Sequence, residues 1–158
     1  MKKMIILILA SYCTLYAQTN VEILSNYEDS AEKVISFVKN NQIAEAKTEN
    51  LLLADHGIKV MNSYLAKKQE CKDQYKVFIE KIPSMYNLTV KELHSLYHDG
   101  NGIPRASRSC YLGRAQVIHP VMNQVRLQGE VSETIKNEII EETEEVIEHL
   151  EMIKKVIL

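Results

Sequence analysis

The stretch VSETIKNEIIEETEEVIEHLEMIKKVI, residues 131–157, decides the fold. Its apolar residues recur every three or four positions, and glutamates and lysines separate them. This spacing matches one face of an α-helix, so the stretch predicts a long amphipathic helix whose apolar face packs on a core. The apolar positions are Val131, Ile135, Ile139, Ile140, Val146, Ile147, Leu150, Ile153 and Ile157.

The same spacing recurs through the rest of the chain. It predicts further helices over residues 27–38, 43–82, 89–99 and 107–125. Pro83 is expected to end the second of these, and His119-Pro120 predicts either a new helix start or a kink in the fourth. Because no stretch combines β-branched alternation with hairpin turns, the sequence predicts an all-α fold, a four- or five-helix antiparallel bundle.

Composition excludes several classes of protein. The chain has 158 residues, 46% of them hydrophobic and 25% charged, which indicates one ordinary globular domain rather than a disordered or low-complexity chain. Its net charge of −2 gives no argument for nucleic-acid binding. No nucleotide-binding loop, nucleophile elbow or zincin motif is present, so the chain is not expected to be an enzyme.

The N-terminus has the pattern of an export signal. Lys2 and Lys3 precede an apolar run that reaches Ala17, and polar residues follow. This pattern predicts a cleavable signal peptide over residues 1–17 and a mature domain over residues 18–158, located in the periplasm or secreted. A membrane anchor is the alternative, but the run is shorter than the ~20 residues that span a bilayer, and no later segment could do so. A lipoprotein site at Cys13 is disfavoured because bulky Tyr12 precedes it.

Two cysteines, Cys71 and Cys110, remain after such a cleavage. An even number of cysteines in an exported chain predicts a disulfide between them. The alternative is that both are small buried residues of the helical core.

Charge is distributed unevenly near the C-terminus. Residues 100–128 contain no Asp or Glu but hold all four arginines, Arg105, Arg108, Arg114 and Arg126. The first three are candidates for binding an anionic ligand, since guanidinium groups pair with phosphate or carboxylate in two-pronged contacts. The alternative is internal pairing with glutamates of the last helix, whose acidic run 141–145 is expected to form a solvated face.

Three histidines are candidates for a metal site. His94 and His98 are four residues apart on one helix face, and His119 follows the Gly/Pro loop. Neutral imidazoles bind zinc or copper, and a non-covalent haem could use the histidines and arginines together. Ordinary helix histidines would give the same spacing.

Two functional hypotheses remain. The first is an exported, non-enzymatic helical-bundle interaction module that binds a protein partner at the cell envelope. The alternative is a small metal- or haem-binding bundle that uses His94, His98 and His119.

Overall fold

The computed structural model describes residues 19–100, 102 and 110–158. The expected signal peptide and two of the candidate arginines, Arg105 and Arg108, lie outside the described residues. The described part contains helices and no strand, which confirms the all-α prediction for those residues. The elements are α1 Asn20–Lys39, α2 Ile43–Lys67, the 3₁₀ turn η1 Gln69–Cys71, α3 Lys72–Met85, α4 Val90–Leu93, the π-helical turn η2 His94–His98, α5 Tyr111–Arg126 and α6 Glu133–Ile157.

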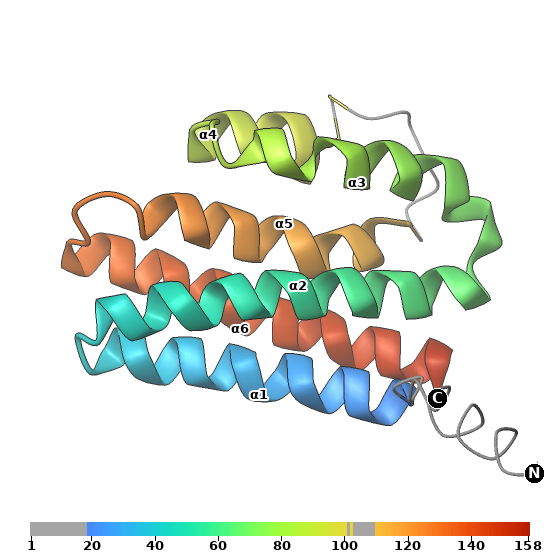
Figure 1. Ribbon diagram of the computed structural model, residues 1–158, viewed down its shortest axis with the longest axis horizontal. Helices are drawn as coiled ribbons and strands as arrows, with labels where there is room; N and C mark the ends of the chain where they lie inside the picture. Colours follow the sequence, from blue (N-terminus) through green and yellow to red (C-terminus); the bar gives the residue numbers. More distant parts are fainter. Residues whose placement is uncertain (1–18, 101, 103–109) are drawn as a thin grey trace, which may run out of the picture.

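Four long helices pack around a common core. α1 packs on α2, α2 on α5, α5 on α6, and α6 returns to α1, with each neighbour running in the opposite direction (Figure 1). α3, α4 and η2 lie over α5, on the side away from α1 (Figure 1). No helix within the described ranges is both long and apolar enough to cross a membrane.

α5 is the central helix of the fold. Every residue from Gly113 to Gln124 is buried, because other helices cover this element from several sides. Polar side chains of α5 are therefore held inside the protein, among them His119, which is 0% exposed. Buried polar groups need partners, so this helix is where a site with defined geometry is expected.

Pro120 is inside α5 and neither starts a helix nor ends one. A proline has no N–H and cannot donate to the carbonyl four residues earlier, which here belongs to Gln116. The hydroxyl of Tyr27, from α1, donates to that carbonyl at 3.0 Å. A contact from another helix thus satisfies the carbonyl, and the proline is accommodated within a continuous helix.

Gly57 lies against the same carbonyl. A Cβ at this position would be 2.0 Å from the oxygen of Gln116, so α2 can approach α5 this closely only without a side chain. The sequence alone marks Gly57 as a weak point of a long helix. The structure shows instead that the glycine permits close helix packing.

The second predicted helix is two helices. α2 ends at Lys67, η1 follows, and α3 begins at Lys72, so the interpretation of residues 43–82 as one helix is wrong. Lys68 leaves the helical region with φ −125° and ψ 64°. Pro83, expected to end this helix, is instead inside α3, which continues to Met85.

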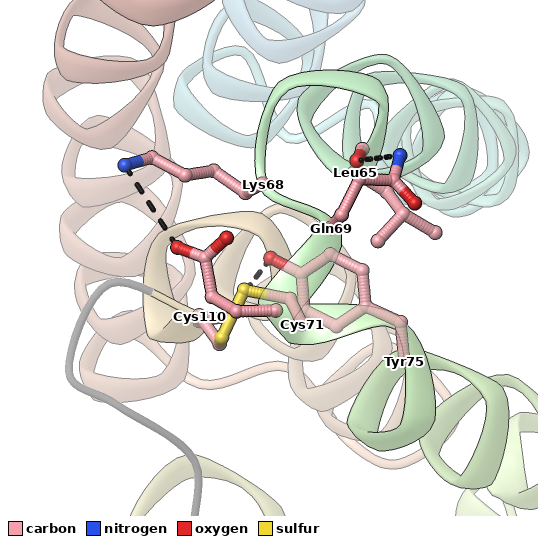
Figure 2. The surroundings of a disulfide bond; sticks show 7 residues. Leu65, Lys68, Gln69, Cys71, Tyr75 and Cys110 are labelled. Atoms are coloured by element: carbon pink, nitrogen blue, oxygen red, sulfur yellow. Dashed lines mark hydrogen bonds and ion pairs between the residues drawn. A yellow bond between two sulfur atoms is a disulfide. The ribbon is translucent and has the colours of Figure 1, made fainter.

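Cys71 and Cys110 form the expected disulfide, with Cα atoms 5.4 Å apart (Figure 2). The bond joins the residue before α3 to the residue before α5, and both cysteines are buried. Beside it, the Tyr75 hydroxyl donates to the Cys110 carbonyl at 3.0 Å. The disulfide therefore fixes the start of α5, where the candidate site begins.

Candidate metal centre

Four of the chain's five histidines meet where η2, α5 and α6 come together. His94 and His98 come from η2, His119 from α5 and His149 from α6. The ring centroids of His98 and His119 are 5.2 Å apart, and those of His119 and His149 are 5.8 Å apart. The three histidines that the sequence singled out are thus in one cluster, and a fourth joins them.

Tyr111 lies between two of these imidazoles. Its hydroxyl is 2.7 Å from Nε2 of His98 and 3.4 Å from Nε2 of His119. Tyr111 is the first residue of α5 and directly follows the disulfide-bonded Cys110. Two ring nitrogens from different elements therefore face one oxygen atom.

A carboxylate holds the opposite nitrogen of each ring. Nδ1 of His98 is 3.2 Å from Asp99 Oδ1, and Nδ1 of His119 is hydrogen-bonded to Glu142 Oε2. An ionised carboxylate only accepts hydrogen bonds, so each Nδ1 is the protonated nitrogen. In the neutral form of each ring, Nε2 is then the unprotonated nitrogen and presents its lone pair to Tyr111.

This arrangement leaves one of the two Nε2 lone pairs without a hydrogen-bond donor. The Tyr111 hydroxyl has one proton and can donate to only one of the two Nε2 atoms. The other lone pair faces the cluster unsatisfied, and a cation placed between the rings would satisfy it. A carboxylate behind each imidazole is also the usual arrangement around metal-bound histidine, where it fixes the tautomer and the ring orientation.

Glu145 of α6 supplies a carboxylate donor. One possible ligand atom from each of His98, His119 and Glu145 lies within 4.8 Å of the others. Tetrahedral zinc with bonds of about 2.0–2.1 Å separates its ligand atoms by about 3.3 Å, so small side-chain rotations would bring the three together. Two nitrogens and one oxygen suit a divalent transition metal.

His149 is the histidine of the cluster that the sequence analysis did not propose as a ligand. Its Nδ1 is buried and has no hydrogen-bond partner among the described residues. Its Nε2 is 3.7 Å from Glu145 Oε1, and its ring centroid is 5.6 Å from that of Tyr111. Burial lowers the pKa of His149, which favours the neutral form that can bind a metal.

Glu142 is held in its ionised form. Burial alone would raise its pKa, but the hydrogen bond from His119 and the charge and hydrogen bond of Arg126 keep the pKa below the ordinary value. Arg126 Nη2 donates to Glu142 at 3.2 Å, and its Nε donates to Glu138 at 3.1 Å. For Arg126, the alternative prediction that the arginines pair with glutamates of the last helix is therefore confirmed.

Arg114 behaves differently from Arg126. It is buried, donates from Nη1 to the carbonyl of Tyr97 at 3.2 Å, and lies 5.8 Å from the centre of the Tyr111 ring. Its Nε has no hydrogen-bond partner in the described part of the chain. Arg114 therefore borders the site, and it is the only one of the three proposed anion-binding arginines that can be placed there.

An acidic pocket adjoins the histidines. It has a volume of about 150 Å³ and is lined by Arg126, Glu138, Glu141, Glu142 and Glu145. The acidic run was expected to be a solvated face, but Glu142 turns inward with only 18% of its side chain exposed. The pocket gives cations a negatively charged approach to the site.

The spacing of three residues in α6 could have indicated that they contribute to this site. Glu142, Glu145 and His149 are three and four positions apart, which places them on one helix face. That face borders the core face formed by Val146 and Leu150. Nothing in the sequence indicated that η2 and the start of α5 would lie opposite it, so Tyr111 could not be identified.

None of the protein-family models, curated proteins or solved structures compared with the chain gives a significant match.

Proposed function

We propose that this protein is a metal-binding helical bundle that holds one divalent transition-metal ion, zinc or copper(II), between η2, α5 and α6. His98, His119 and Glu145 are the proposed ligands, and Tyr111 and His149 are the nearest groups for a further position. One observation carries the proposal: two imidazoles, each backed by a carboxylate, direct their unprotonated nitrogens at a single point.

The geometry favours an ion over haem. His98 and His119 already converge on one hydroxyl, 2.7 and 3.4 Å away, which leaves no room for a porphyrin between them. His119 is also fully buried and tied to Glu142. An ion needs only small rotations of side chains, so zinc and copper remain and haem is set aside.

We propose binding rather than catalysis, and an exported location. The donors come from three packed elements, and His119 is fully buried and tied to Glu142, which suits the group to holding an ion in place. The disulfide supports export, because such bonds persist in oxidising compartments and are rare in the cytosol. The proposal of a protein partner rests on different residues, the exposed Leu51 and Leu52 of α2, and does not need the histidines.

Metal titration of the disulfide-bonded protein tests the function. We expect zinc and copper(II) to bind in calorimetry, and His98→Gln to weaken the tighter binding event by at least about tenfold, the order typical for altered metal environments. His98 is partly exposed, so the variant should keep its helix content by circular dichroism.

His56→Gln is the matched control. His56 is the one histidine outside the cluster, and its Nδ1 contacts Ser30 and the carbonyl of Asn26. This variant should bind zinc and copper as the wild type does. Equal loss of binding in both variants, or no binding by the wild type, would contradict the proposal.

A further inference from the structure

We infer that the protein binds a second divalent ion on the outer side of His98, so that one imidazole bridges two metals. This inference rests on the proposed function, because His98 is also a ligand of the inner site. The second site consists of His94 Nδ1, the carboxylate of Asp99 and Nδ1 of His98.

The π-helical turn brings these groups together. Asp99 N donates to His94 O at 2.8 Å, which closes the wide turn characteristic of a π-helix. Within it, the rings of His94 and His98 stack with centroids 4.3 Å apart and planes inclined by 23°. Such turns inside helices are frequent at functional sites.

Both stacked rings present Nδ1 to the same carboxylate. Asp99 Oδ2 is 3.3 Å from His94 Nδ1, and Asp99 Oδ1 is 3.2 Å from His98 Nδ1. The possible ligand atoms of the three residues lie within 4.8 Å of one another. Two imidazole nitrogens and a carboxylate are the same donor set as that of the inner site.

His98 connects the two groups through its two ring nitrogens. Its Nε2 faces Tyr111, His119 and the inner site, and its Nδ1 faces Asp99 and the outer site. The outer ion takes the place of the proton on Nδ1: the N–H bond breaks, a metal–nitrogen bond forms, and the proton leaves to solvent. His94 also faces Asp99 with Nδ1. Its proton moves through solvent from Nδ1 to Nε2, so His94 binds as a neutral imidazole and releases no net proton. His98 is then an imidazolate, and its negative charge offsets part of the charge of the two ions.

The two sites should fill in a fixed order. His119 is fully buried, whereas about half of the His94 and Asp99 side chains is exposed. Mobile exposed ligands lose more conformational freedom on binding, and the second ion is repelled by the first. The inner ion therefore binds first and more tightly. Its charge also makes the remaining proton on His98 easier to displace.

Copper(II) provides a direct test, because an imidazolate bridge couples the electron spins of two copper ions. The disulfide-bonded wild type is titrated with copper(II) and followed by electron paramagnetic resonance. The first equivalent should give the full signal of an isolated ion. The second should bind and, because the two spins pair, lower the total signal at low temperature below that of one isolated ion. A pH-stat should register an extra proton released for it.

His94→Ala separates the two sites. It removes an exposed side chain, so it should retain the first copper ion and lose the second, with no loss of signal intensity. His56→Ala, which alters a histidine outside the cluster, should match the wild type.

A wild type that binds one ion, or two ions with uncoupled spins, overturns the bridge and leaves the proposed function intact. Retention of the second coupled ion in His94→Ala also overturns it. A wild type that binds no ion overturns both proposals.

Discussion

Tyr27 supplies the hydrogen bond that Pro120 removes from α5. Its hydroxyl reaches the carbonyl of Gln116 across the interface between α1 and α5, and both groups are buried. Replacing Tyr27 by Phe keeps the ring and leaves this carbonyl without a side-chain donor in an apolar interior. We expect Tyr27→Phe to lower the free energy of unfolding by about 1–3 kcal/mol, measured by urea denaturation.

Tyr86→Phe is the control for this prediction. Tyr86 is half-buried at the end of α3, and its hydroxyl makes no hydrogen bond to any described residue. Its replacement should change the free energy of unfolding by no more than about 0.5 kcal/mol. If both variants lose the same stability, the contact between Tyr27 and Gln116 is not what makes the proline tolerable.

At the scale of single residues, the sequence revealed the histidines more readily than their partners. The four-residue spacing of His94 and His98 could be read directly, and His119 was recognised as a third candidate. Their carboxylate partners are of two kinds. Asp99 is adjacent to His98, whereas Glu142 is 23 residues from His119 and reaches it only through the packing of α6 on α5.

At the scale of the helices, strong periodicity predicted that a helix is present more reliably than where it begins and ends. Residues 131–157 predicted α6 almost to its ends, since its apolar face is continuous. The division between α2 and α3 was missed, although six positions, rather than three or four, separate Leu65 from Cys71. Thr89 and Glu92 form a capping box at the start of the predicted helix 89–99, but the π-helical turn after it depends on tertiary contacts that propensities do not encode.

The disulfide connects two of these elements, and its removal should weaken both the fold and the site. Its two cysteines are 39 positions apart, and the loop that it closes contains α3, α4 and η2. In the chain-entropy model such a loop contributes about 3–4 kcal/mol. We expect the double variant Cys71→Ala, Cys110→Ala to lose about this much stability in urea denaturation and to bind zinc less tightly, because η2 and Tyr111 are then less firmly held.

A reductant provides the check on this prediction. It should lower the urea midpoint of the wild type towards that of the double variant and leave the double variant unchanged. If the reduced wild type keeps its original midpoint although thiol titration shows that Cys71 and Cys110 are both reduced, the disulfide does not stabilise the fold.

At the scale of the whole molecule, the site is a product of the topology. Its donors come from η2, α5 and α6, which meet only because α3 and α4 fold back over α5. The spacing of residues could predict the helices and which residues lie on one helix face. It placed the candidate ligands mainly within residues 94–119. It could not place Glu145 and His149 opposite them, because that depends on how α6 rotates as it packs.

The buried tyrosines give the whole molecule a predictable response to alkaline pH. Tyr27 and Tyr75 are fully buried, and burial raises the pKa of both phenols. In the unfolded chain these groups ionise near pH 10. Above that pH the unfolded state releases protons that the folded state retains, so the stability present below about pH 10 is lost as the pH rises.

This loss should appear as a slope in stability against pH. Each phenol that ionises only on unfolding removes about 1.4 kcal/mol per pH unit above its unfolded pKa. We therefore expect the urea midpoint of the wild type to fall steadily between about pH 10 and 11.5, as the unfolded phenols ionise. Tyr27→Phe should start from a lower midpoint but fall less steeply, because one of the phenols with a raised pKa is gone. Equal slopes in the two proteins would show that Tyr27 ionises as readily in the folded chain as in the unfolded one, despite its burial.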